Sequence, residues 1–247
     1  MTEHAFHTIR LPVLLFAFVC LTAYTLEASA APGDRVLFRE EFRDLSNWKD
    51  FFFPKISRHS RYSIEQGEGT AFLKAESNNS ASAIVYRESF PVQEYPLLRW
   101  RWKVANLYER GNARSKAGDD YPIRIYIMFE YDPEKAGPLE RLKYGFVKKR
   151  YGEYPPHSSL SYVWASSQEE VKILSSPYTD QAKMVLLQSG PERIGTWQDQ
   201  EVDIRADYRE AFGTDPPARA RIAIMNDSDD TGESSTSCIE YIEVFGR

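Results

Sequence analysis

The chain contains very little cysteine, with Cys20 and Cys238 as the two thiols in 247 residues. Cys20 falls in an N-terminal segment that has the features of a removable leader. Without that segment Cys238 stands alone, and no disulfide can form within the chain. The fold must then depend on an apolar core rather than on cross-links. Aromatic residues make up 14% of the sequence and supply large side chains for such a core.

The sequence also lacks the motifs of several enzyme classes. Only His59 and His157 lie beyond the leader, and no zinc-ligand spacing occurs. There is no phosphate-binding loop, no dinucleotide fingerprint and no serine-hydrolase nucleophile elbow. We therefore expect no nucleotide, flavin or zinc cofactor. The net charge of −5 lacks the basic excess of nucleic-acid binders, so we expect no nucleic-acid partner.

The only long apolar run, residues 11–21, is too short for a comfortable transmembrane span of roughly 20 residues. It follows Arg10 and precedes Ala28-Ser29-Ala30, an Ala-x-Ala cleavage box. This order predicts a signal peptide over residues 1–30 and no transmembrane helix after cleavage. The product would be exported to the periplasm or the exterior of a bacterium. The alternative is an uncleaved anchor, because the first ten residues are only weakly basic.

Alternation of apolar and polar residues dominates residues 31–247 and predicts about ten short strands. No repeat or Gly/Ser-rich linker divides this segment. The pattern indicates one all-β domain, an antiparallel β-sandwich of jelly-roll or concanavalin type, with one or two short helices. The expected strands are residues 36–40, 62–65, 71–75, 83–87, 98–104, 123–131, 160–165, 183–188, 219–225 and 239–245.

Two segments have helical periodicity. Residues 203–212 predict one helix, with Asp203 as its N-cap and Gly213 at its end. Residues 139–151 predict a second, basic helix in an insertion at about 132–159. Its apolar face, which we expect to cover one end or face of the sandwich, consists of Leu139, Leu142 and Phe146. The basic residues of 139–151 leave three partners open: an anionic polymer, a membrane surface or water alone.

Acid-rich loops adjoin two of the expected strands. Residues 116–120 precede the strand at 123–131, and residues 226–232 follow the strand at 219–225. Several carboxylates in one short loop repel each other unless a cation or polar ligand offsets the repulsion. The two loops therefore indicate a binding site on a β scaffold.

The first loop and its strand predict recognition of a polyhydroxylated ligand. Arginine offers a planar fork of donors, and aspartate accepts hydrogen bonds from neighbouring hydroxyls. The alternative is a structural ion-pair network that holds the loop. The expected contacts are Lys116, Asp119, Asp120, Arg124 and Tyr126, with Trp164 stacking on the ligand.

The second loop predicts a calcium site formed by Asp227, Asp229 and Asp230. The sequence Asp-x-Asp-x-Thr-Gly at 227–232 matches the first half of an EF-hand loop. It is not an EF-hand, because Cys238 stands where the final Glu is required and a strand precedes the loop. The alternative is an Asx-rich turn without a metal.

Two further patterns have weaker functional interpretations. Trp100 and Trp102 share one face of the strand 98–104, which favours a core position over a sugar-binding platform. Glu201-Val202-Asp203 is similar to the start of the catalytic strand of laminarinase-type glycoside hydrolases. The third acid is replaced by Ala206, so the pair of catalytic carboxylates is incomplete. The segment also fits the start of a helix.

An ordered set of motifs resembles the bacterial exported family known as domain of unknown function 3047. The resemblance covers about residues 36–245 and implies a secreted β-sandwich of jelly-roll type with no established activity. The motifs are Trp100-Arg101-Trp102-Lys103-Val104, Lys116-x-Gly118-Asp119-Asp120-x-x-x-Arg124-Ile125-Tyr126, Tyr162-Val163-Trp164, Ser176-Pro177-Tyr178-Thr179, Gly195-x-Trp197, Asp207-Tyr208-x-x-x-Phe212-Gly213 and Ala223-Ile224-Met225-x-Asp227-Ser228-Asp229-Asp230-Thr231-Gly232.

These observations leave three functional hypotheses. The leading one is glycan binding on the concave face or rim of the sandwich, with calcium ordering the rim. A polysaccharide-degrading hydrolase or lyase is the second. It would use Asp119 or Asp120 as general acid or base, Arg124 against a uronate carboxylate and Tyr126 for proton transfer. The third is a structural envelope protein whose acids bond only to neighbouring protein groups. The oligomeric state stays open.

Overall fold

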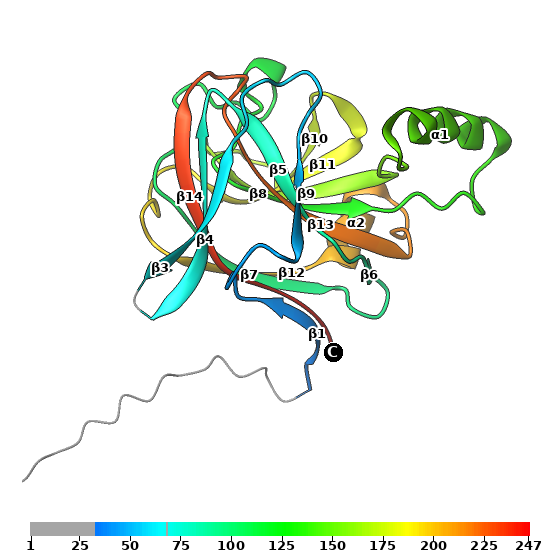
Figure 1. The fold of residues 1–247 in the computed structure, drawn as a ribbon, viewed down its shortest axis with the longest axis horizontal. Helices are drawn as coiled ribbons and strands as arrows, with labels where there is room; N and C mark the ends of the chain where they lie inside the picture. The colour runs from blue at the N-terminus through cyan, green and yellow to red at the C-terminus, as the bar shows by residue number, and fades with distance from the viewer. Residues whose placement is uncertain (1–32, 68) are drawn as a thin grey trace, which may run out of the picture. The chain divides into compact units, whose positions relative to one another are not determined.

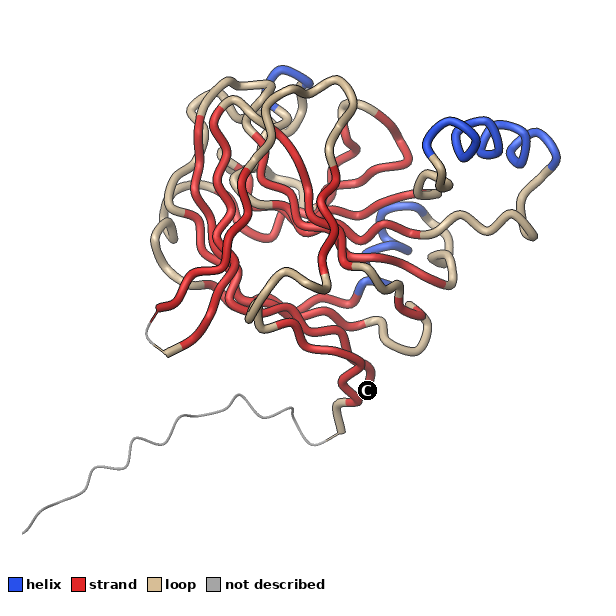
Figure 2. Tube along the Cα trace, viewed as in Figure 1, coloured by secondary structure: helices blue, strands red, loops and turns tan. Residues whose placement is uncertain are grey.

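Two β-sheets packed face to face make up the computed structural model, which describes residues 33–67 and 69–247 (Figures 1 and 2). The segment Gly33–Arg247 forms one contact unit. The predicted signal peptide, residues 1–30, lies outside the described residues. Of the helices that the structure describes, none has the length and apolar character needed to cross a membrane.

One sheet has six strands and the other has eight. The first runs in the order β12 (Gln198–Asp203), β7 (Leu97–Val104), β14 (Ser234–Gly246), β4 (Thr70–Asn78) and β3 (Arg61–Gly67), and β1 (Arg35–Glu40) also pairs with β14. The second runs in the order β10 (Ile173–Ser176), β11 (Thr179–Ser189), β9 (Ser158–Ala165), β8 (Arg124–Phe129), β13 (Arg219–Asp227), β5 (Ala81–Tyr86) and β2 (Trp48–Phe51), and β6 (Phe90–Pro91) pairs with β13.

The all-β sandwich and all ten expected strands are confirmed, with small shifts of their ends. The antiparallel arrangement has one exception, because β11 pairs with β9 in parallel. Four strands were missed: β2, β6, β10 and β12. Strand β12 shows why, since five of its six residues are polar or acidic and, among the described strands, it pairs with β7 alone at the edge of its sheet. Its pairing with β7 overrides the weak local pattern.

The Trp100–Trp102 pair belongs to the core, as the alternation predicted. Both indoles are fully buried between the sheets. The Trp100 ring lies 5.4 Å from the Tyr162 ring of β9, and the Trp102 ring lies 6.1 Å from that of Trp164. Aromatic pairs at such separations add to the free energy gained by burial. These contacts join β7 of one sheet to β9 of the other.

Helix α2 (Ile204–Phe212) begins and ends where its capping residues predicted. The Asp203 side chain accepts hydrogen bonds from the backbone N–H groups of Arg205 and Ala206, and Gly213 ends the helix in the left-handed conformation. The interpretation of 201–203 as a helix start is wrong for the first two residues. Glu201 and Val202 lie on strand β12, and only Asp203 serves the helix.

Helix α1 (Pro138–Tyr151) confirms the second predicted helix, but its apolar face does not cover the sandwich. The relative solvent exposure is 82% for Leu139, 58% for Leu142 and 67% for Phe146. The helix packs through Tyr144 instead, whose ring stacks on that of Tyr131 with the centroids 3.8 Å apart. A tyrosine on the opposite side of the helix therefore determines which face turns inward.

Candidate functional site

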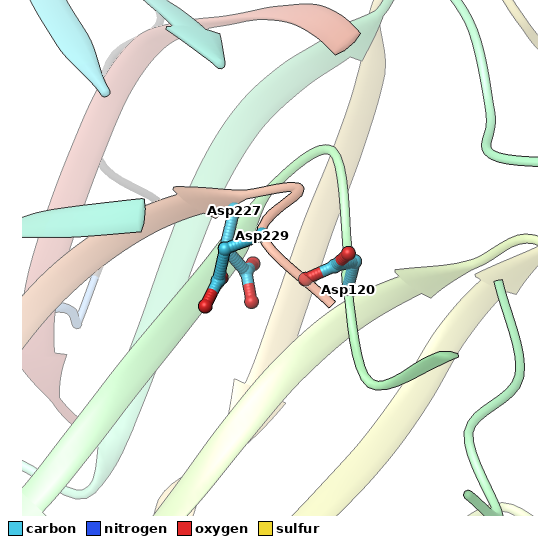
Figure 3. Close-up of side chains that lie close together, drawn as sticks. All are labelled: Asp120, Asp227 and Asp229. Atoms are coloured by element: carbon cyan, nitrogen blue, oxygen red, sulfur yellow. The ribbon is translucent and has the colours of Figure 1, made fainter. Parts of the chain in front are cut away.

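The two acid-rich loops meet at one edge of the eight-stranded sheet. Strands β8 and β13 are antiparallel neighbours, and Arg124 near the start of β8 pairs with Met225 near the end of β13. The loop before β8 and the loop after β13 therefore lie side by side (Figure 3). The backbone N–H of Asp227 donates to the carbonyl oxygen of Tyr121, which joins the loops directly.

Gly118 fixes the path of the first loop. It ends the short 3₁₀ turn η1 (Lys116–Gly118), and its carbonyl oxygen accepts a hydrogen bond from the backbone N–H of Asn112. A Cβ atom at position 118 would lie 2.6 Å from the backbone nitrogen of Asn112. Only glycine allows this approach, which places Asp119 and Asp120 at the edge of the sheet.

Arg124 is buried and holds both loops. Its Nε donates to Asp227 Oδ1 over 3.0 Å, and Nη2 pairs with the second oxygen of the same carboxylate. Nη2 also donates to the carbonyl oxygen of Asp119 over 2.6 Å, and Nη1 lies 3.5 Å from Asp119 Oδ1. This arrangement is the ion-pair network that the sequence left as the alternative to ligand contact.

Three carboxylates converge beside this network. Asp120, Asp227 and Asp229 each offer an oxygen within 4.8 Å of the others (Figure 3). The Oδ2 atom of Asp120 accepts a hydrogen bond from the backbone N–H of Thr231 over 2.6 Å. Its Oδ1 atom is buried and has no hydrogen-bond partner among the described residues. A carboxylate oxygen left in this state needs a donor or a cation.

The charges of this acidic cluster are not balanced by Arg124 alone. Burial raises the pKa of the Asp229 carboxyl, and the neighbouring charge of Asp120 raises it further. Burial also raises the pKa of Asp119, although Arg124 acts in the opposite direction. Both directions mean that the folded chain disfavours the ionised carboxylates. A bound cation would reverse this effect, since it favours the charged form.

The residues of this cluster fit a metal ion. Carboxylate oxygens are the ligands that Ca²⁺ and Mg²⁺ prefer, and Asp120, which offers an oxygen to the cluster, also has a buried oxygen without a hydrogen-bond partner among the described residues. The grouping differs from the predicted set in one residue. Asp230 is exposed and accepts a hydrogen bond from the Tyr178 hydroxyl over 2.8 Å, so Asp120 takes its place. Metal binding itself stays a prediction.

Most of the residues expected to contact a ligand have no surface for it. Asp119, Asp120 and Arg124 are between 1% and 4% exposed. Trp164 is fully buried, and its indole N–H donates to the carbonyl oxygen of Gly190. Stacking of Trp164 on a sugar ring is therefore incompatible with this structure. Lys116 is exposed, and its ammonium lies 5.1 Å from the Tyr178 ring.

Of the expected contacts, Tyr126 lines an open groove. The groove has a volume of about 520 Å³ and lies on the outer face of the eight-stranded sheet. Val85 of β5, Ala223 of β13 and Tyr126 of β8 are register partners, so their side chains share that face. Ala83 and Ala223 have small side chains, so they leave room for the groove between the larger side chains that line it.

Aromatic and charged side chains both line the groove. Phe51 and Phe53 line it on the side of β2, and Tyr154 lines it before β9. Within the described part of the chain, Tyr131 Oη and Arg221 Nε are buried polar atoms without a hydrogen-bond partner, and both residues line the groove. This groove was not predicted from the sequence. The available signals were the aromatic run at 51–53 and the Tyr-Pro-Pro segment at 154–156.

Comparison with known families gives one match over most of the chain. Residues 46–243 match the family described as "Protein of unknown function (DUF3047)". The chain belongs to this family. The resemblance found from the sequence motifs is thereby confirmed. No curated protein matches this sequence.

Several solved structures share features of the fold at low similarity. One is the family 11 carbohydrate-binding module of the cellulosomal cellulase Lic26A-Cel5E of Clostridium thermocellum, with 12% identity and a TM-score of 0.41, covering 88% of this chain and 97% of that chain. Endoglucanase 3 of Trichoderma harzianum, from family GH12, has 7% identity and a TM-score of 0.39, covering 88% and 100%. Winged bean acidic lectin complexed with methyl-alpha-D-galactose has 8% identity and a TM-score of 0.37, covering 86% and 98%. At such scores the likeness indicates nothing about the ligand or activity of this chain.

Proposed function

We propose that this protein is an exported glycan-binding protein whose ligand occupies the groove on the outer face of the eight-stranded sheet. The observation that carries the proposal is a groove lined by exposed or half-buried aromatic rings, Phe51 and Tyr154 among them, together with the exposed charged residues Lys49, Asp50 and Glu153. Export rests on the predicted signal peptide at residues 1–30.

The groove has the chemistry that a sugar chain requires. A pyranose ring has apolar C–H faces that pack on aromatic rings, and Phe51, Tyr126 and Tyr154 provide such rings. Its hydroxyl groups require hydrogen-bond partners at fixed positions. The exposed side chains of Lys49, Asp50 and Glu153 line the groove and supply both donors and acceptors. A purely apolar ligand would leave these polar groups unpaired.

We further propose that the acidic cluster holds calcium, with Asp120, Asp227 and Asp229 as its protein carboxylates. Calcium accepts irregular sets of six to eight oxygen ligands, whereas magnesium requires a near-ideal octahedron. Carboxylates and backbone carbonyls of loops form such an irregular set, which suits calcium better than magnesium. The cluster connects to the groove through Arg124, whose guanidinium contacts Asp227 and lies 6.0 Å from the Tyr126 ring. Calcium would then stabilise one end of the groove.

Replacing Phe51 with alanine is expected to weaken glycan binding by about tenfold, because one stacking surface is lost. Phe52→Ala is the matched control. Phe52 is adjacent and 51% exposed, but it stacks on His59 rather than lining the groove. Native gel electrophoresis through gels cast with different polysaccharides measures the effect as reduced retardation.

The same gels separate the three functional hypotheses. Retardation without loss of polymer stain, reduced by Phe51→Ala and unchanged by Phe52→Ala, supports a binding protein. A cleared zone would replace it with a polysaccharide-degrading enzyme and name the substrate. Equal retardation of both variants would place the ligand outside the groove. Normal migration in every gel would favour the structural envelope protein.

A further inference from the structure

Helix α1 presents a row of apolar side chains to solvent. Leu139, Leu142 and Phe146 lie on one helical face and are exposed by 82%, 58% and 67%. An isolated exposed apolar residue is ordinary, but three on one convex face of a single helix form a continuous stripe. The tyrosine that fixes the helix, Tyr144, is 4% exposed and lies on another face.

Contacts on the opposite side of helix α1 keep the apolar row facing solvent. The Tyr144 ring stacks on that of Tyr131 at an interplanar angle of 12°. The ammonium of Lys148 lies 4.3 Å from the Tyr154 ring, which also lines the groove. Rotating the helix to bury the apolar row would break both contacts. Figure 1 shows α1 standing off to one side of the sheets, with its length free of other elements.

Basic residues flank the apolar row on both sides. At 100° per residue, Lys143 projects beside Leu139 and Lys149 beside Leu142, and both lysines are exposed. The helix segment contains five basic residues and one acidic residue, whereas the whole chain has a net charge of −5. The positive charge of the insertion is therefore local to this helix.

We propose that helix α1 docks on an anionic phospholipid surface. An apolar stripe bordered by lysines is the arrangement of helices that lie in the plane of a membrane interface. The apolar side chains enter the acyl boundary and the ammonium groups contact lipid phosphates. Each basic residue near such a surface strengthens binding by about fivefold.

A lipid surface fits this helix better than the other partners. An anionic polysaccharide would pair with the lysines but leave Leu139, Leu142 and Phe146 in water. A protein partner would need a groove that matches the convex row, and the acidic groups around it would need to match Lys143 and Lys149. A bilayer accepts a straight convex row without a matching groove, because its surface adapts to the side chains.

The test is co-sedimentation of residues 33–247, which contain both sheets and the core, with lipid vesicles. These residues exclude the apolar run at 11–21, which would bind lipid by itself. Vesicles of phosphatidylcholine with phosphatidylglycerol are compared with vesicles of phosphatidylcholine alone. We expect at least tenfold stronger binding to the anionic vesicles, and a loss of that preference in high salt.

Two variants assign the binding to the helix. Leu142→Glu with Phe146→Glu is expected to reduce binding by at least tenfold. Lys143→Gln with Lys149→Gln is expected to reduce it by about 25-fold, from fivefold for each lysine. Val171→Glu is the control, since Val171 is 44% exposed and lies outside α1. All five substituted positions are exposed, so the melting temperature should change little in every variant. Thermal unfolding therefore distinguishes lost docking from lost folding.

Three outcomes would overturn the proposal. Equal binding to neutral and anionic vesicles would remove the electrostatic part. Unchanged binding of the Leu142→Glu, Phe146→Glu variant would place any lipid contact elsewhere. Absence of vesicle binding with concentration-dependent dimerisation, abolished by the same variant, would make a second copy of the chain the occupant. Glycan binding in the groove is measured separately, so either result leaves that proposal intact.

Discussion

Arg124→Met is expected to lower the free energy of unfolding by about 3–5 kcal/mol, the usual cost of removing one partner from a buried ion pair. Methionine fills much of the same space but leaves the carboxylates of Asp227 and Asp119 without their cationic donor. Since domains of this size are stable by only about 5–15 kcal/mol, the variant would be close to unfolding at ambient temperature. Urea denaturation followed by tryptophan fluorescence measures the change.

Arg101→Met provides the matched control. Arg101 is also a strand arginine with acidic partners, Glu240 at 3.0 Å and Asp199 at 3.9 Å, but its side chain is 39% exposed. Surface ion pairs contribute about 0–1 kcal/mol, so this variant should unfold almost like the wild type. Equal losses in the two variants would contradict the structural role of Arg124.

A second substitution keeps the test informative if Arg124→Met does not fold. Combining it with Asp227→Asn removes the charge that the first substitution leaves unpaired. The double variant should therefore be more stable than Arg124→Met alone, because the two effects are coupled. Additive losses would mean that Arg124 stabilises the loops by packing on the Tyr121 and Tyr126 rings, 4.6 Å and 6.0 Å away, rather than by charge.

The strands were predictable where one face is buried and the other is not. Strand β7 alternates between fully buried residues such as Trp100 and half-buried ones such as Arg99, and this two-residue period is present in its sequence. Strand β12 has no such period in its sequence. It forms because it pairs with β7 at the edge of the sheet. The parallel pairing of β11 with β9 depends on chain topology, which local alternation does not encode.

The candidate cation site was predictable in its parts but not in its assembly. Each acidic loop was evident from its sequence. The two loops lie together because β8 pairs with β13, a long-range contact that local sequence does not reveal. That pairing brings Asp120 to Asp227, while the turn at 228–232 directs Asp230 toward Tyr178. Which of Asp120, Asp229 and Asp230 joins the cluster depends on that strand pairing and on the path of the turn.

Burial explains why the expected ligand contacts were misplaced. Arg124 alternates with core residues along β8, so its side chain was expected on an open face. The loop at 116–122 folds over that end of the strand, and the Arg124 guanidinium lies 4.6 Å from the Tyr121 ring. The open part of the same face begins at Tyr126, and its aromatic walls come from segments distant in sequence.

Calcium at about one hundred times its dissociation constant is expected to stabilise the protein by about 2.7 kcal/mol relative to chelator. For a chain of this size that corresponds to a rise of about 5–10 °C in the melting temperature. The physical cause is that the ion binds the folded arrangement of Asp120, Asp227 and Asp229, which the unfolded chain does not hold. Differential scanning calorimetry of the protein with calcium, magnesium and chelator measures the shift.

Asp120→Asn and Asp230→Asn separate the cation site from general charge effects. Each removes one negative charge from the same pair of loops, but only Asp120 belongs to the cluster. Asp120→Asn should abolish the calcium shift and Asp230→Asn should retain it. In chelator, Asp120→Asn should melt at or above the wild-type temperature, because it relieves repulsion that no cation then offsets. A calcium shift retained by Asp120→Asn would mean that the cluster is an Arg124-centred structural network and that the ion binds elsewhere, whereas a shift lost by both variants alike would indicate a general effect of the loop charges. The glycan groove would then have to function without a metal at its edge.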